Sequence, residues 1–218
     1  MKPYINIHTH VIDNDTNNYT ILNVYPEEYI PKKSFFSTGI HPWRINENWK
    51  NELKVIANNL LFTNCLALGE CGLDKRIETP ISKQIEIFEA QIKLASELKK
   101  PIIIHCVAAF DEILEILKQH SFKEKVIFHG FSKSKELAQQ LYNLGYYISF
   151  GKYLIQNENL SEVFVNTPQD FYFLETDNSQ YTINQIYKKA SEINQLSVEK
   201  IQEIVYANFK KVFKLNYQ

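Results

Sequence analysis

The fold is decided by the stretch Ile5-Asn6-Ile7-His8-Thr9-His10, which lies close to the start of the sequence. A short run rich in β-branched residues indicates a buried strand, and residues two apart on a strand point to the same side. His8 and His10 therefore project together where this strand ends. Two imidazoles on one face suit a divalent transition metal such as zinc.

The composition is that of an ordinary globular protein. The chain has 218 residues, of which 44% are hydrophobic, and it carries 24 basic and 25 acidic side chains. The formal net charge of -1 provides no overall positive charge for binding long duplex nucleic acid, although a local basic patch is compatible with it. Three irregularly spaced cysteines favour a reducing compartment over a disulfide framework. With no apolar run of about 18 residues and no signal-peptide pattern, we expect a soluble, cytoplasmic protein.

Strand-like runs alternate with helix-like segments along the whole chain. Strands are predicted at residues 5–10, 19–25, 34–40, 65–69, 101–104, 125–128, 146–150 and 171–174, with a polar loop at 13–18 and a connection at 26–33. Helices are predicted at 47–61, 82–99, 109–118, 134–144, 158–165, 183–193 and 198–212. This alternation predicts an α/β fold with a parallel sheet, and eight strands favour a (β/α)8 TIM-type barrel forming a single domain over residues 1–218. The alternative, an open doubly wound sheet, would need a Gly-rich turn after the first strand.

Side chains that bind metals fall at the ends of nearly all these strands. In a barrel, the carboxyl ends of the strands face the same way and build the active site. Residues far apart in the sequence should therefore converge there. Each of them alone could be a hydrogen-bonded polar group at a strand end, but six residues of metal-binding type at such positions favour a metal site. The predicted metal ligands are His8, His10, Glu70, His105, His129 and Asp177.

Two further groups of residues are candidates for contact with a substrate. His41 also follows a strand, but Pro42-Trp43 comes next, so we interpret it as a substrate contact or a structural residue. Lys75 follows the Glu70 motif, and Lys133 and Lys135 follow His129, so these lysines are candidates for phosphate binding. The alternative is that all three are solvated charges.

Seven short motifs resemble, in order, those of the TatD-type metal-dependent deoxyribonucleases. They are Asn6-Ile7-His8-Thr9-His10, Gly39-Ile40-His41-Pro42-Trp43, Gly69-Glu70-Cys71-Gly72-Leu73-Asp74, Pro101-Ile102-Ile103-Ile104-His105, His129-Gly130-Phe131-Ser132, Tyr147-Ile148-Ser149-Phe150-Gly151 and Leu174-Glu175-Thr176-Asp177. The resemblance covers essentially the whole chain and implies an amidohydrolase-like barrel with two divalent metal ions. It also implies the ligand roles: His8 and His10 on one metal, His105 and His129 on the other, Glu70 as the bridge, and Asp177 at the water.

The chain departs from the family pattern at three places. Asn6 stands where Asp usually opens the first motif, so His8 would be oriented by a weaker acceptor. Val107 stands where the family commonly has an Arg suited to phosphate contact, and Asn178-Ser179 stands where Pro is usual. These departures bear on the substrate more than on the metal ligands.

The residues and the resemblance together predict a metal-dependent hydrolase of phosphodiesters. We expect a TatD-like DNase that acts on DNA ends or short single strands, using Mg, Mn or Zn, with Glu70 and Asp177 as the catalytic carboxylates. Asp177 can both orient a water molecule and accept its proton. The alternative is a hydrolase of an amide, a lactone or a cyclic C–N bond, since the same barrel supports those reactions. A non-catalytic metal-binding protein is a third reading. The expected partner is DNA or a small phosphoester, and no obligate protein partner is inferred.

Overall fold

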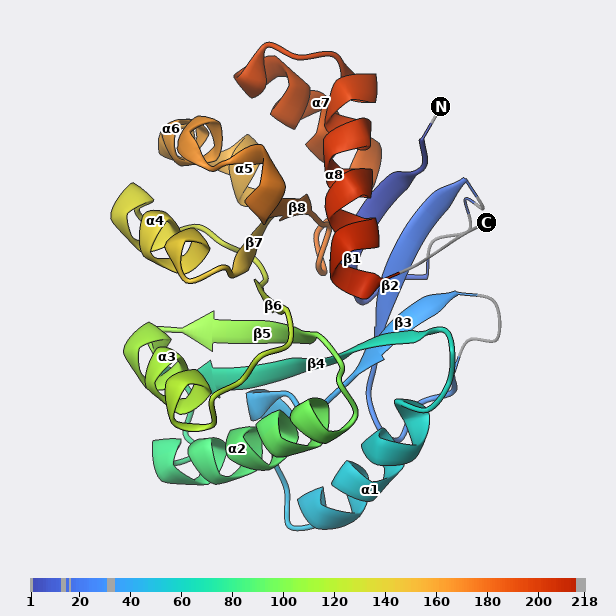
Figure 1. Ribbon diagram of the computed structural model, residues 1–218, viewed down its shortest axis with the longest axis vertical. Helices are drawn as coiled ribbons and strands as arrows, with labels where there is room; N and C mark the ends of the chain where they lie inside the picture. Colours follow the sequence, from blue (N-terminus) through green and yellow to red (C-terminus); the bar gives the residue numbers. More distant parts are fainter. Residues whose placement is uncertain (1, 13–14, 16, 31–33, 215–218) are drawn as a thin grey trace. The chain divides into compact units, whose positions relative to one another are not determined.

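The computed structural model describes residues 2–12, 15, 17–30 and 34–214 (Figure 1). Within these residues, eight strands alternate with eight α-helices and two short 3-10 helices. The predicted loop at 13–18 and connection at 26–33 lie partly outside them. The chain divides into a terminal unit, residues 1–22 with 127–218, and a central unit, residues 23–126. None of the helices in the described residues has the length and apolar character needed to cross a membrane.

The terminal unit is built on short parallel strands. They are β1 (Tyr4–Thr9), the start of β2 (Asn18–Val24), most of β6 (Val126–Phe128), β7 (Tyr147–Phe150) and β8 (Tyr172–Leu174). β1 pairs with β2, and β7 pairs with both β6 and β8, each time in parallel. Its helices are α4 (Lys135–Asn143), α5 (Tyr153–Gln156), α6 (Asn159–Asn166), α7 (Ile183–Asn194), α8 (Val198–Phe213) and the 3-10 helix η2 (Gln169–Phe171). Among these, α8 packs against β1 and β8.

Helix α7 is tied to β1 by a buried tyrosine. The helix starts with a capping box, in which the side chains of Thr182 and Gln185 satisfy each other's backbone N–H groups. One turn further on, the hydroxyl of Tyr187 accepts a hydrogen bond from the Ile5 N–H at 3.0 Å and donates one to the Ile5 carbonyl at 3.1 Å. This pair of bonds fixes the strand that leads to His8 and His10.

The central unit carries three strands that pair in parallel in the order β3, β4, β5. They are β3 (Phe35–Thr38), β4 (Cys65–Asp74) and β5 (Ile102–Val107). The helices are α1 (Trp49–Asn59), α2 (Ile81–Glu97), α3 (Phe110–Gln119) and the 3-10 helix η1 (Pro42–Arg44). Figure 1 shows α2 lying along β4, and the two elements pack closely together.

The predicted ends of two strands are wrong. β4 continues to Asp74 and β5 continues to Val107, so Glu70 and His105 lie inside strands instead of following them. The two strands stay paired through Gly72, whose partner is His105. Gly72 has φ +143°, and a Cβ there would lie 2.0 Å from the His105 carbonyl oxygen. Only glycine permits this approach. Gly72 therefore allows the pairing to continue, although glycine usually weakens a strand.

Candidate metal centre

The terminal unit brings three of the predicted ligands together where β1 and β8 end. His8, His10 and Asp177 offer ligand atoms that all lie within 4.8 Å of one another. The Oδ1 atom of Asp177 lies 3.5 Å from His10 Nε2 and 3.9 Å from His8 Nε2. His8 is fully buried, whereas the Asp177 side chain is 20% exposed, so a water molecule can reach this carboxylate.

The backbone of Asp177 is held by the end of β1. Its N–H donates to the His8 carbonyl at 3.0 Å, and its own carbonyl accepts from the His10 N–H at 3.3 Å. The hydroxyl of Thr9 donates to the same carbonyl at 3.0 Å. Asp177 has φ +52°, a left-handed conformation that is uncommon for residues other than glycine, Asn and Asp. The bridge to β1 therefore fixes the carboxylate through its backbone.

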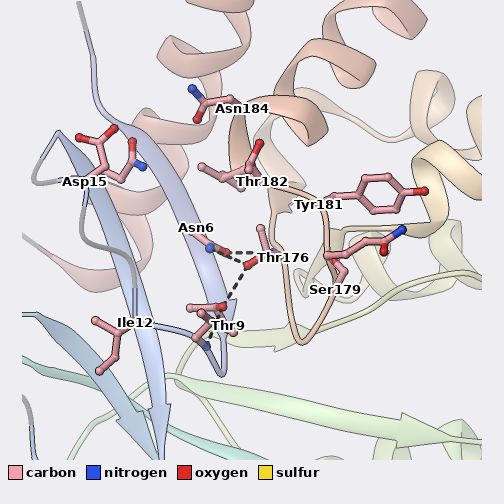
Figure 2. A pocket seen from close by; sticks show the side chains of 13 residues that line it. Asn6, Thr9, Ile12, Asp15, Thr176, Ser179, Tyr181, Thr182 and Asn184 are labelled. Carbon is pink, nitrogen blue, oxygen red and sulfur yellow. Dashed lines mark hydrogen bonds between the residues drawn. The ribbon is translucent and has the colours of Figure 1, made fainter.

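Asn6 supports this bridge through a chain of hydroxyl groups (Figure 2). Its amide nitrogen donates to Thr176 Oγ1 at 2.8 Å, and its amide oxygen accepts from the Thr176 N–H at 3.0 Å. Thr176 Oγ1 in turn donates to Thr9 Oγ1 at 3.0 Å, and Thr9 donates to the Asp177 carbonyl. Because the Asp177 carbonyl can only accept, Thr9 must donate to it and accept from Thr176, and Thr176 must accept from the amide nitrogen of Asn6. The place where the family pattern has Asp is thus linked to the position of Asp177.

His129 is oriented by a buried carboxylate that precedes Asp177. Glu175 is 1% exposed, and its Oε1 atom accepts from the Gly130 N–H at 2.8 Å and lies 3.4 Å from His129 Nδ1. Its other oxygen accepts from the hydroxyl of Ser149. Since a carboxylate only accepts, it favours the His129 tautomer with hydrogen on Nδ1, which leaves Nε2 to bind a metal.

Lys152 is a site residue that the sequence analysis missed. Its ammonium nitrogen lies 3.3 Å from Asp177 Oδ2 and 3.1 Å from Asn178 Oδ1. The side chain is 26% exposed, so the charge lies next to a predicted ligand and still reaches solvent. A signal was present, because Lys152 follows the end of β7, just as the predicted ligands follow or end their own strands.

The central unit forms a second group around Glu70. His41, Glu70 and His105 offer ligand atoms within 4.8 Å of one another. The Oε1 atom of Glu70 lies 2.9 Å from His105 Nδ1 and 3.2 Å from His41 Nε2. The Glu70 N–H donates to Asn23 Oδ1 at 2.7 Å, so this residue is held by both its backbone and its side chain.

Asp74 holds His105 from the other side, and no role was predicted for it. Its Oδ2 atom accepts from the indole N–H of Trp43 at 2.7 Å and lies 3.4 Å from His105 Nε2. Burial alone would raise the pKa of Asp74, but hydrogen bonds from Trp43, the Arg76 N–H and His105 together hold that pKa below its ordinary value. Asp74 can thus accept from an N–H on His105 Nε2, and Glu70, 2.9 Å away, can accept from one on Nδ1. With a metal bound at Nδ1, the hydrogen would lie on Nε2, where Asp74 would accept it. The period of two along β4 could have shown this, since Glu70 and Asp74 share one face.

Two buried glutamines of α2 hold the backbone beside this group. Gln84 accepts from the Asp74 N–H at 2.8 Å and donates to the Asp74 carbonyl at 2.9 Å. Gln91 does the same for Ile40, at 2.8 Å and 3.2 Å, immediately before His41. Each glutamine is only 1% exposed. Two amides on the apolar face of an otherwise typical helix were the sequence signal for these contacts.

The residues predicted to contact substrate differ in their burial and in their ion pairs. Lys75 forms an ion pair with Glu112, and Lys135 forms one with Glu162. Lys133 is exposed. His41 is 5% exposed and belongs to the group around Glu70. Substrate binding by His41, Lys75 and Lys133 stays a prediction.

The donor atoms in both groups fit a divalent metal. Imidazole nitrogen and carboxylate oxygen suit zinc and other transition metals, and carboxylates also suit magnesium and manganese. The spacing of less than 4.8 Å is compatible with several donors around one ion. The roles of the individual ligands, including the bridge formed by Glu70, stay predictions.

We expect Asp74→Asn to weaken metal binding by roughly 10–100-fold, the usual effect of changing a group that orients a ligand histidine. The amide carries no charge to favour the required tautomer of His105. Competition titration with a zinc indicator would measure the change, and circular dichroism would verify the fold. Asp111→Asn, at an exposed position of α3, is the matched control. Equal affinity in both variants would contradict a role for Asp74.

The chain resembles known proteins over nearly its whole length. The family model described as TatD related DNase matches residues 6–214. An uncharacterized metal-dependent hydrolase of Methanocaldococcus jannaschii is 28% identical over 194 residues, which cover 83% of this chain and 76% of that protein. The corresponding hydrolase YabD of Bacillus subtilis is 29% identical over 200 residues, covering 84% and 78%.

A solved structure has the same fold. YJJV, a TatD homolog from Escherichia coli, superimposes with a TM-score of 0.83 at 20% identity, covering 97% of this chain and 98% of that one. This likeness confirms the predicted (β/α)8 TIM-type fold class. By the family match from residue 6 to residue 214, the chain belongs to the TatD related DNase family of metal-dependent hydrolases.

Proposed function

We propose that this protein is a metal-dependent phosphodiesterase that cleaves DNA ends or short single strands. The observation that carries the proposal is the group of His8, His10 and Asp177, whose ligand atoms lie within 4.8 Å of one another. We assign one divalent ion, Mg, Mn or Zn, to this group and a second to Glu70 and His105. His129, which Glu175 orients, is the sixth proposed ligand.

Asp177 is the proposed general base. A bound divalent ion would supply Lewis acidity, which can lower the pKa of water from about 15.7 to about 7. Asp177 can then position the water and take its proton, since its side chain is 20% exposed. Glu175 is less suited to this work, because it is 1% exposed and both its oxygens already accept hydrogen bonds. Lys152 holds Asp177 Oδ2, which leaves Oδ1 directed toward the two histidines.

We assign the nucleoside portion of the substrate to a cavity in the terminal unit that none of the proposed metal ligands lines (Figure 2). It has a volume of about 450 Å³ in the terminal unit and is bordered by Thr9 and Thr176, the neighbours of the proposed ligands. Its other lining residues are Asn6, Val11, Ile12, Asp15, Asn18, Ser179, Gln180, Tyr181, Thr182, Ile183 and Asn184.

The chemistry of this lining favours a neutral polar group over a phosphate. Among the described lining residues, Asp15 is the only charged one, so the cavity itself would repel an anion. The amides of Asn18, Gln180 and Asn184 can donate and accept hydrogen bonds along a base edge, as amides do in nucleic-acid recognition. A phosphate would instead lie near the metal ligands and the charge of Lys152.

The test is product analysis with a short single-stranded oligonucleotide labelled at either end, in Mg²⁺, Mn²⁺ or Zn²⁺. We expect stepwise release of mononucleotides from one end, and release slower by about 10²–10⁴-fold with Asp177→Asn prepared in parallel, which controls for contaminating nucleases. A panel of lactones, small amides and cyclic amides runs beside it. Turnover of one of these compounds, with the oligonucleotide left intact, would favour the alternative hydrolase.

A further inference from the structure

Both ring nitrogens of His41 are engaged by the protein. The Trp43 backbone N–H donates to His41 Nδ1 at 3.1 Å, and His41 Nε2 lies 3.2 Å from Glu70 Oε1. The ring is 5% exposed and belongs to the group whose atoms lie close enough to share a metal ion. Whether His41 would be a ligand in that group depends on where its hydrogen lies.

The hydrogen bond from Trp43 settles the tautomer. A backbone N–H can donate only to a nitrogen that keeps its lone pair, so Nδ1 of His41 carries no hydrogen. The hydrogen of the ring is then on Nε2, which lies 3.2 Å from Glu70 Oε1. Neither nitrogen of His41 is left with a lone pair for a metal.

His105 differs from His41 in this respect. Its two nitrogens face two carboxylates, Glu70 on the Nδ1 side and Asp74 on the Nε2 side. Asp74 also accepts from the Trp43 indole, so it remains in place as the acceptor for an N–H on Nε2. His105 can therefore carry its hydrogen on Nε2, toward Asp74, and present the Nδ1 lone pair to a cation shared with Glu70, a choice that His41 lacks.

We propose that His41 is a positioning residue that donates a hydrogen bond to Glu70 and is not itself a metal ligand. The inference rests on the proposed metal site. It assigns the histidine of the His41-Pro42-Trp43 motif to orienting a carboxylate instead of contacting a substrate.

The local backbone is built to hold His41 in this state. His41 is the N-cap of η1, and its side chain accepts from the Trp43 N–H as an N-cap residue does. Pro42, at the first position of that helix, has no N–H, so the Trp43 N–H is the first one available to the cap. Gln91 holds both backbone groups of Ile40, the residue before His41.

The direct test is nitrogen NMR of protein labelled with ¹⁵N-histidine, recorded before and after addition of Zn²⁺. We expect His41 to show hydrogen on Nε2 in both states, with its nitrogen shifts little changed. The shifts of His105 should change on binding. Hydrogen on Nδ1 of His41, or scalar coupling of its ring to ¹¹³Cd²⁺ used in place of zinc, would overturn the proposal.

Two substitutions separate the functions of the two nitrogens. His41→Gln places an amide N–H near the position of Nε2, so it can still donate to Glu70. His41→Asn places its amide near Nδ1, so it keeps the cap and loses the donor. We expect His41→Asn to weaken Zn²⁺ binding by roughly 10–100-fold and His41→Gln to restore most of this loss. The number of bound ions should not change in either variant.

His120→Gln is the matched control, because His120 ends α3 and makes a partly exposed contact with Glu89. An affinity of His41→Asn equal to that of this control, or the loss of one whole ion in both His41 variants, would contradict the proposal. If the variants fail to fold, the NMR measurement on the unaltered protein still decides. None of these measurements requires turnover, so a protein that binds zinc as expected but cleaves no oligonucleotide would refute the proposed function alone.

Discussion

Exhaustive dialysis against a chelator should abolish hydrolysis, and Mg²⁺, Mn²⁺ or Zn²⁺ should restore it. The proposed reaction depends on a water molecule that is ionised near neutral pH. Without the metal, the pKa of this water would return from about 7 to about 15.7, which lowers the amount of hydroxide available at neutral pH by roughly eight orders of magnitude. The carboxylates cannot replace this effect, because Asp177 accepts a proton but provides no positive charge to the attacked group.

The measurement is the rate of oligonucleotide cleavage before dialysis, after it, and after each metal is returned. Elemental analysis must show that the dialysed sample holds no metal, and circular dichroism must show that it remains folded. Full activity in a verified metal-free sample would refute the metal-dependent mechanism. Loss of the fold on dialysis would require the test to be repeated after refolding with each metal.

Asp177→Asn should lower kcat by about 10²–10⁴-fold while the protein stays folded, since that is the usual contribution of a general base. The fold should survive because the bridge to β1 uses the backbone of residue 177, through its bonds with His8, Thr9 and His10. Asn also tolerates the left-handed conformation that Asp177 adopts. The amide keeps an oxygen that can bind a metal weakly, so part of the metal content should remain.

Glu175→Gln is the decisive comparison, since this carboxylate lies two residues before Asp177. Its amide oxygen could still accept from Gly130 and its NH2 could donate to Ser149, but the negative charge that favours the His129 tautomer would be lost. We therefore expect this variant to lose metal first and activity as a consequence. The two variants are assayed together at saturating metal, with metal content measured in each. A larger loss of kcat in Glu175→Gln, with its metal intact, would show that the base has been assigned to the wrong residue.

Much of the fold could be predicted from the sequence, and so could the grouping of several candidate ligands. The alternation of strands and helices follows from hydrophobic periodicity, and the convergence of His8, His10 and Asp177 follows from their places at the ends of strands. These are consequences of local geometry that repeat along the chain. Each motif lies at or near the end of a strand, so motifs far apart in the sequence could still indicate one metal site.

The supporting contacts could not be predicted in the same way. Asp74, Gln84 and Gln91 act through hydrogen bonds to residues from other elements, and no short-range pattern specifies such partners. The predicted ends of β4 and β5 were wrong because the pairing beyond residues 69 and 104 depends on a close approach of the two strands at Gly72, which only a residue without a side chain permits. The contact of Lys152 with Asp177 joins residues 25 positions apart, so the sequence does not distinguish this lysine from the others that follow strands.

The bridge between Thr9 and Asp177 has a consequence for the order in which the chain becomes functional. These two residues are 168 positions apart, and closing a loop of that length costs about 5 kcal/mol in chain entropy. On the ribosome, both imidazoles emerge early, while the carboxylate and the backbone of Asp177, which bridges to Thr9, emerge only after most of the protein has been translated. A truncated product that ends before residue 177 would carry His8 and His10 without their acidic partner. Tight metal binding at this group would therefore distinguish finished chains from interrupted ones.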